Sequence, residues 1–400
     1  MGPTRQADRA LAPDLARGGM LLLIALANAA GAFNANAPGV DPSPRGLERA
    51  YNIFLFTFVH SRAFPLFAIM FGYGLIQFAR RQDQAGASPD TVRRLLLRRN
   101  AWLIVFGAGH GILLYSGDFL AAYGIVGIAF TLLLLRRSDR SYRLTAWYLG
   151  LVAVYTAALS VVVVVGLLRN EAGESDRAAL PTSPFPSMLA ESYPASVVDR
   201  LSEWPVNTLT VLPIILFVWV GAWAARQRLL DQPGQRRGLL RTGAIVGLAA
   251  GVAGGLPMGL FAAGLLDVHP ATSPWVKLLY ETSGLFGAIG YACVFGLLAA
   301  HLADRSHLPR VPRALVALGQ RSLSGYLFQS VAWLILVPPF TLALAQRAGS
   351  PTFVAAGCAT AVWIMSLIGA DLMRRAGHRG PAETLLRRLT YRRTKKGSQR

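Results

Sequence analysis

The chain has 400 residues, of which 53% are hydrophobic and only 15% are charged, and its formal net charge is +20. Soluble proteins carry about 25% charged residues, so a large part of this chain does not face water. The composition excludes a disordered protein and argues against a soluble enzyme. It leaves open where the excess positive charge lies.

Ten apolar runs are long enough for membrane-spanning helices, because a bilayer core about 30 Å thick needs about 20 mostly apolar residues per helix. The runs lack the alternation typical of strands, and only helices can pair their backbones in lipid. We therefore predict an all-α polytopic membrane protein. The runs cover roughly 18–36, 53–78, 100–117, 119–135, 144–168, 206–225, 242–266, 275–302, 322–345 and 352–373. Only residues 116–118 separate the third run from the fourth, which predicts a tight hairpin.

The basic residues predict the orientation of these helices. If the N-terminus is cytoplasmic, 32 of the 40 Lys and Arg residues fall in cytoplasmic segments. Such a bias in the loops decides topology, and it fits an even number of spans. We expect both termini in the cytoplasm, with a short N-terminal segment (1–17), one helical domain (18–373) and a basic tail (374–400).

The positive charge therefore marks one membrane face and does not indicate a nucleic-acid surface. The basic tail is expected to contact anionic lipid headgroups. The extracytoplasmic segment 169–205 is acidic and rich in proline, and we interpret it as an irregular connector, with a lid over an outward-facing site as the alternative. Both cysteines lie in predicted helices, so the sequence predicts neither a disulfide framework nor a metal site.

Polar groups inside the apolar runs are candidates for function, because they are costly in lipid. At 1.5 Å per residue, His60 and His110 each lie about 10 Å below the outer surface. Asn28 is near the middle of the first run, Arg62 is half a turn below His60, and Asp118 is at the outer hairpin. We predict that these five residues surround one cavity in the outer half of the protein.

Each of these residues also has a structural interpretation. A membrane histidine can bond a backbone carbonyl, Asp118 can cap the turn, and Asn28 can bond a neighbouring helix. Arg62 can snorkel or pair with Glu281, another acid inside a predicted helix. The glycines on either side of His110 favour the close approach of a ligand or of a second helix.

A second polar group lies on the cytoplasmic side. Arg17 precedes the first run, Arg98 and Arg99 begin the third, and Arg321 and Ser322 begin the ninth. The planar arginine fork matches phosphate, and a helix N-terminus attracts anions. These residues predict a site for a phosphorylated cytosolic cofactor, with ordinary positive-inside charge as the alternative.

Five motifs follow one another along the chain. They are DLARG at 14–18 with Asn28 after it, AFPLFAIMFGYG at 63–74, His110 with SGDFL at 116–120, GQRSLSGYLFQS at 319–330, and GPAE at 380–383 with a following Arg388. Together these motifs resemble the YeiB-like family of bacterial polytopic membrane proteins, a family labelled as a domain of unknown function. The resemblance extends over nearly the whole chain and implies a bacterial cytoplasmic membrane.

That family is similar to a larger group of transmembrane acyltransferases, which includes lysosomal heparan glucosaminide acetyltransferase. The resemblance implies acyl transfer from a cytosolic acyl-CoA to a hydroxyl or amine, on a glycan, lipid or small molecule, at the far side of the membrane. The chain departs from the glucosaminide branch in one respect: no histidine follows shortly after Asn28.

The implied roles follow from this resemblance. His110, or else His60, would be the general base, which contributes roughly 10²–10⁴-fold, and Asp118 would support it. Asn28 would bond the thioester oxyanion. The cytoplasmic group would hold the CoA phosphates: Arg17, Arg98, Arg99, Arg321 and Ser322. The remaining candidates have a role in substrate binding or in structure: Arg62, Glu281, Tyr326 and Gln329.

Two other classes of function stay open. One is a transporter of a small lipophilic molecule, in which the same residues line a path and histidine protonation drives transport. The other is a non-catalytic membrane scaffold or sensor. The sequence predicts neither the acceptor nor the oligomeric state.

Overall fold

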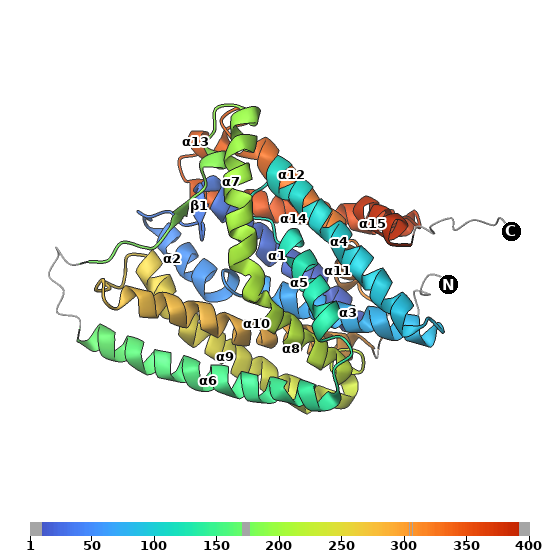
Figure 1. Cartoon of the computed structure of the whole chain (residues 1–400). Helices are drawn as coiled ribbons and strands as arrows, with labels where there is room; N and C mark the ends of the chain where they lie inside the picture. The colour runs from blue at the N-terminus through green and yellow to red at the C-terminus, as the bar shows by residue number, and fades with distance from the viewer. Residues whose placement is uncertain (1–9, 170–176, 304, 306, 392–400) are drawn as a thin grey trace.

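The computed structural model describes residues 10–169, 177–303, 305 and 307–391. It is a helical bundle with one two-stranded ribbon (Figure 1). The first half contains α1 (Leu11–Phe33), α2 (Leu47–Phe54), the π-helix η2 (Leu55–Val59), α3 (Ala63–Gln84), α4 (Pro89–Leu113), α5 (Leu120–Leu133) and α6 (Asp139–Leu168). The second half contains η4 (Pro186–Met188), α7 (Tyr193–Val211), η5 (Leu212–Ile214), α8 (Ile215–Arg226), η6 (Pro233–Arg236), α9 (Arg237–Ala262), α10 (Ser273–Ala303), α11 (Arg310–Gly319), α12 (Ser322–Leu336), α13 (Leu344–Arg347), α14 (Pro351–Arg375) and α15 (Pro381–Tyr391).

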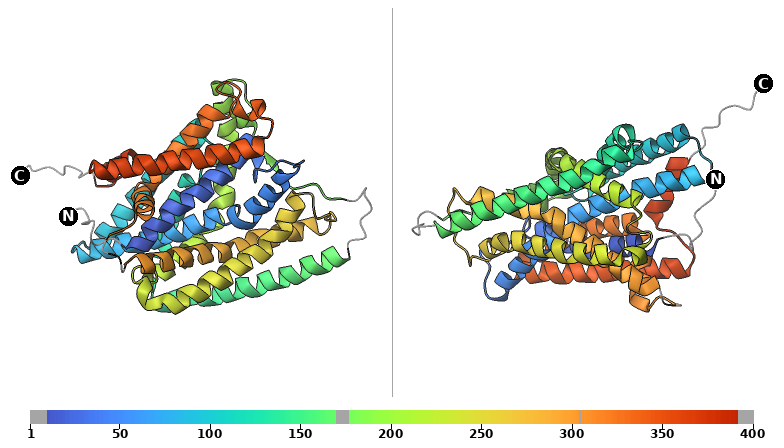
Figure 2. Two further views of the ribbon diagram at one scale, coloured as in Figure 1. Left: turned by 180° about the vertical axis from the view of Figure 1, so that it is seen from behind. Right: turned by 90° about the horizontal axis from the view of Figure 1, so that it is seen from below.

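The described part of the chain contains seven helical segments that are long and apolar enough to cross a membrane, which confirms an all-α protein of membrane type. They are 11–33, 47–84, 139–168, 193–226, 233–262, 273–303 and 351–375. Two further helices, α5 and α12, are apolar but shorter. Helix α6 lies at the edge of the bundle beside α10 (Figure 2), and apolar side chains such as Trp147 are largely exposed on it, as expected for a surface that faces lipid.

The predicted hairpin is present, since α4 ends at Leu113 and α5 begins at Leu120. We call the end of the bundle with this turn the hairpin end. Helix α15 lies at the opposite end (Figure 1), which we call the tail end. Helix α1 begins there at Leu11, so Asp14 and Arg17 lie inside the first helix and not before it, and the predicted 1–17 segment is partly helical.

The predicted run 53–78 lies within one membrane-length segment, 47–84, but it is not one continuous helix, because the chain breaks in the middle of this segment. After η2, His60 is extended and Ser61 has a φ of 55°. Helix α3 then begins at Ala63. Non-helical backbone at membrane depth needs polar partners from the protein. Buried Arg62 supplies one by donating to the carbonyl of His60 at 3.1 Å, and it is anchored by a second bond, at 2.6 Å, to the carbonyl of Gly251 in α9.

The predicted irregular segment 169–205 is only partly irregular. Residues 170–176 lie outside the described residues, but α7 is already helical from Tyr193. Before it, β2 (Ser183–Pro184) pairs antiparallel with β1 (Asn36–Ala37), with Asn36 opposite Pro184. This ribbon ties the segment to the connection that follows α1.

Glycines bring several helices into backbone contact, as is common between membrane helices. Helices α3 and α8 cross at Gly72 and Gly221. A Cβ on Gly72 would lie 1.9 Å from the carbonyl oxygen of Val218, and one on Gly221 would lie 1.9 Å from that of Ile69. No side chain fits at this crossing without separating the helices.

We expect the substitutions Gly72→Ala and Gly221→Ala each to destabilise the bundle by about 1–3 kcal/mol, the usual cost of overpacking. The thermal midpoint of purified protein in detergent measures the loss. Gly150→Ala on α6 is the control, because a Cβ there meets no atom within 4 Å. Equal midpoints for Gly72→Ala and Gly150→Ala would contradict the assigned crossing.

Candidate functional site

Two neighbouring cavities are lined by predicted site residues in the described part of the chain. The first, which we call the Asn28 cavity, has a volume of about 350 Å³ and is lined by Asn28, His60, Ser61 and Phe64, among others. The second, which we call the arginine cavity, has a volume of about 480 Å³ and is lined by residues of the tail end, including Arg17 and α15.

The two cavities share part of their walls. Four residues line both, and we call them the partition: Phe67, Leu120, Tyr123 and Tyr326. The rings of Phe67 and Tyr123 are 4.7 Å apart, and the Tyr123 hydroxyl donates to the carbonyl of Phe64 at 3.1 Å. A single layer of mostly aromatic side chains therefore separates the cavities.

The Asn28 cavity contains polar atoms without partners. Asn28 Nδ2 and His60 Nε2 are both buried, and neither has a hydrogen-bond partner among the described residues. Buried polar groups are normally paired, so these two atoms are positioned to bind a polar group of a ligand.

A charged pair and part of the segment before α7 border the Asn28 cavity. Lys277 and Glu281 line it, half-exposed and 3.6 Å apart. Pro181, Ser183 and Phe185 from the segment before α7 line it too. This segment therefore borders the cavity.

The sequence placed Arg62, His110 and Asp118 around this cavity as well, and none of the three is among its lining residues. Arg62 faces α9 and α10, where it also donates to Ser283 Oγ at 3.3 Å. Its predicted pairing with Glu281 is wrong, because that carboxylate contacts Lys277. The break at Ser61 redirects the backbone, so that Arg62 points to α9 and α10 while His60 lines the cavity.

His110 and Asp118 form a separate buried cluster behind the partition. His110 Nδ1 lies 2.8 Å from Asp118 Oδ1, and His110 Nε2 lies 2.7 Å from Ser330 Oγ. All three side chains are at most 2% exposed. The direct contact with Asp118 is possible because the turn after Leu113 folds back toward the helix.

Asp118 also caps α5. Its carboxylate accepts the backbone N–H groups of Leu120 at 3.0 Å and Ala121 at 2.9 Å. Trp204 and Asn207 of α7 add hydrogen bonds to its carboxylate and its carbonyl. The same carboxylate therefore both caps α5 and contacts His110.

The arginine cavity collects positive charge from four elements. Its basic lining residues are Arg17, Arg81, Arg99 and Arg387, against the acids Asp14 and Glu383. Ser322 lines it as well. The guanidinium of Arg99 lies 5.7 Å from the centre of the Phe71 ring. An excess of arginine in a concave site suits a phosphorylated ligand.

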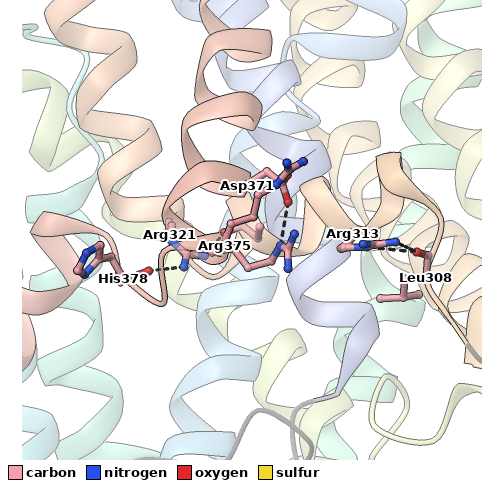
Figure 3. Close-up of polar contacts among 8 residues, drawn as sticks. Leu308, Arg313, Arg321, Asp371, Arg375 and His378 are labelled. Carbon is pink, nitrogen blue, oxygen red and sulfur yellow. Dashed lines mark hydrogen bonds and ion pairs between the residues drawn. The ribbon is translucent and has the colours of Figure 1, made fainter.

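Two of the predicted phosphate ligands are elsewhere. Arg98 is not among the lining residues, because successive residues of a helix point in different directions. Arg321 is buried and donates to the carbonyls of Ala317 and His378, the latter in the turn before α15 (Figure 3). Asp371 forms ion pairs with Arg374 and Arg375 nearby. Several basic residues of this face are therefore paired with groups of the protein itself.

The N-terminus of α12 is also occupied. The carboxylate of Glu383 accepts the N–H groups of Leu323 at 2.8 Å and Ser324 at 3.1 Å, together with the Ser324 hydroxyl. The predicted anion at this helix end is thus a side chain of α15. This contact explains the GPAE motif, because a Cβ on Gly380 would collide with Glu383 and Ser324.

Gln329 and Tyr326 lie on the same helix. Gln329 is fully buried and donates to the carbonyl of Leu21, joining α12 to α1. Tyr326 belongs to the partition and its ring centre is 5.0 Å from that of His110. No three His, Cys, Asp or Glu side chains of the described residues group closely enough to hold a metal ion.

Sequence reasoning missed Ser330, Arg81 and Arg387. Ser330 ends the GQRSLSGYLFQS motif, so its place in a motif was a signal, but its partner is 220 residues away in sequence. Arg387 was grouped with the lipid-facing tail, and only the docking of α15 places it in the cavity.

We expect Glu383→Ala to lower the free energy of unfolding by about 0.5–2 kcal/mol, the usual cost of losing a helix cap. Because the freed N–H groups attract anions, phosphate should raise the thermal midpoint of this variant more than that of the wild type. The exposed Glu191→Ala is the control. A loss no larger than the control's, with no phosphate response, would contradict the assigned cap.

Comparison with known proteins agrees with the motif resemblance. Residues 224–393 match the model of the family described as "Protein of unknown function (DUF418)". The chain is 25% identical over 402 residues to YeiB of Escherichia coli, covering 96% of this chain and 97% of that protein. It is 23% identical over 355 residues to YxaH of Bacillus subtilis, covering 84% and 80%. These similarities support a YeiB-like family of bacterial membrane proteins.

Proposed function

We propose that this chain is a membrane acyltransferase that uses an acyl-CoA donor held in the arginine cavity and a hydroxyl or amine acceptor held in the Asn28 cavity. One observation carries the proposal: two cavities at opposite ends of the bundle share a wall of four side chains. A reaction between a substrate from each side of a membrane needs such an arrangement.

The donor end suits the polyanionic part of CoA. Arg17, Arg99 and Arg387 come from α1, α4 and α15 and line one cavity of about 480 Å³. Charge-assisted bonds from arginine to phosphate are among the stronger ones in proteins. The acyl end of the donor then points toward the partition.

The acceptor end suits a molecule with a polar group and an apolar body. Asn28 and His60 offer the unpaired polar atoms, while Phe64, Met258 and other apolar residues form much of the rest of the wall. Two histidines meet the need for a general base by position: His60 in the cavity wall and His110 behind the partition.

A second candidate, a transporter, is favoured by the break at His60–Ser61. Transporters place broken helices at substrate sites near the middle of the membrane, and this break borders the Asn28 cavity. In that case the partition is a gate and no acyl group is transferred.

We further propose that the chain crosses a bacterial cytoplasmic membrane ten times, with both termini in the cytoplasm. The seven long segments together with α5, α12 and α4 supply the ten crossings. The Asp and Arg residues of α4 all lie between Asp90 and Arg99, in the half of the helix at the tail end, and the following residues to Leu113 are mostly apolar.

This topology predicts the accessibility of single cysteines introduced into a cysteine-free variant. A membrane-impermeant maleimide added to spheroplasts should label Ser183→Cys and leave Gly86→Cys unlabelled, because the two positions lie on opposite faces. Permeabilised cells control for reactivity. The reverse pattern, or labelling of both positions in sealed spheroplasts, would contradict the orientation.

The donor site predicts binding of acetyl-CoA or a longer acyl-CoA to purified protein, measured by calorimetry. Arg99→Ala should weaken binding about tenfold or more, since a hydrogen bond to a charged group contributes about 1.5–3 kcal/mol. Arg98→Ala, its neighbour on α4 outside the cavity, should leave binding nearly unchanged.

Two outcomes would contradict the proposal. If no acyl-CoA binds, the protein has no acyl donor and the proposed acyl transfer is ruled out. Flux of a lipophilic substrate in proteoliposomes, without transfer of a radiolabelled acyl group, favours the transporter.

A further inference from the structure

Ser330, His110 and Asp118 have the arrangement of a nucleophile, a base and an orienting acid. The two contacts of 2.7 Å and 2.8 Å use both ring nitrogens of His110. Such triads are recognised by geometry and roles and not by order in the sequence. The nucleophile and base here come from helices α12 and α4, far apart along the chain.

The two contacts of His110 are compatible with the proton arrangement that a nucleophilic serine needs. In a neutral imidazole beside a carboxylate, Nδ1 donates to Asp118 and Nε2 accepts from the Ser330 hydroxyl. The backbone N–H groups of α5 hold the Asp118 carboxylate in place, which fixes the tautomer needed to activate Ser330.

The triad lies directly behind the partition. Tyr326 precedes Ser330 by four residues on α12, so the two side chains share a helix face. The Tyr326 ring centre is 5.0 Å from that of His110, and its hydroxyl has no hydrogen-bond partner among the described residues. Leu120, also in the partition, donates its N–H to Asp118. Neither Ser330 nor His110 lines either cavity, so the reaction proposed below requires the Tyr326 ring to rotate and open the triad to the space between the cavities.

We propose that Ser330 is an acyl-accepting nucleophile, so that transfer proceeds through an acyl-serine ester. This inference rests on the proposed acyltransferase function. It assigns the base role to His110, while His60 and Asn28 bind the acceptor.

The first half of the reaction loads the serine. Ser330 Oγ attacks the thioester carbonyl carbon while His110 Nε2 takes the hydroxyl proton. The tetrahedral adduct collapses, the carbon–sulfur bond breaks, and His110 returns the proton to the sulfur. CoA leaves as the free thiol in the arginine cavity.

The second half unloads the serine. The acceptor hydroxyl or amine attacks the ester carbonyl from the Asn28 cavity, and His110 takes the acceptor's proton. The carbon–oxygen bond to Ser330 then breaks, and His110 returns the proton to Oγ. The triad ends as it began, so no further reactant is needed.

This route fits the two-cavity arrangement. The donor and the acceptor approach the partition from opposite faces, and a covalent relay needs only the acyl group to pass it. Neither the CoA nor the acceptor has to enter the other's cavity.

The test is a rapid acid quench of purified protein mixed with radiolabelled acetyl-CoA in the absence of acceptor. We expect up to one acetyl group per chain, located on the Ser330 peptide by mass spectrometry. Ser330→Ala should abolish the label, and His110→Gln should slow its appearance by about 10²-fold or more, as expected for loss of a general base.

Two further variants separate chemistry from folding. Ser366→Ala, a buried serine on α14 bonded only to its own helix among the described residues, should label like the wild type. Ser330→Cys keeps a nucleophile and should form a thioester that neutral hydroxylamine cleaves. If Ser330→Ala does not fold, Ser330→Cys decides the question.

The outcomes are distinct. Acetyl-CoA binding and acyl transfer without any protein label, with kinetics that require both substrates at once, would overturn the serine relay and leave the proposed acyltransferase in place. Failure of every acyl-CoA to bind would overturn both. A label that persists in Ser330→Ala would place the nucleophile elsewhere.

Discussion

The carboxylate of Asp118 holds three parts of the protein together. It caps the first turn of α5, bonds His110 of α4, and through His110 fixes Ser330 of α12. Asp118 is fully buried, and a buried carboxylate is stable only when it is amply hydrogen-bonded. The hairpin, the wall between the cavities and the triad behind that wall all depend on this one group.

The tail end follows the same physical rule with a different acid. Glu383 takes the place of an external anion at the N-terminus of α12, and this contact docks α15 over the bundle. Docking brings Arg387 to the cavity that Arg17 and Arg99 line from the other side. The positive charge of the cavity therefore results from packing as much as from the number of basic residues.

The break before α3 shows how an isolated membrane cation is accommodated. Arg62 has no carboxylate partner among the described residues and bonds two carbonyls and a hydroxyl instead. The irregular backbone that it supports lets His60 and Ser61 border the Asn28 cavity. A straight helix would have paired these backbone groups internally and shown the cavity a different surface.

The helical class, the membrane-length segments and the hairpin at 116–118 could be read from the amino-acid sequence alone. This is possible because apolar length and the position of polar turns are local properties. The sequence also singled out Asn28, His60, His110 and Asp118, since polar groups are conspicuous in apolar runs. Depth along a helix suggested a single cavity, but depth carries no information on which face a side chain occupies.

Which of these residues meet depends on how the helices pack. The packing separated Asn28 and His60 from His110 and Asp118, and it moved Arg98 and Arg321 away from the cofactor cavity while bringing Arg387 in. The tertiary structure also revealed Ser330, which bonds His110 although the two residues are 220 positions apart in the sequence. The physical reason is that helix rotation and neighbour choice come from long-range packing, such as the Gly72–Gly221 crossing, and no local pattern encodes them.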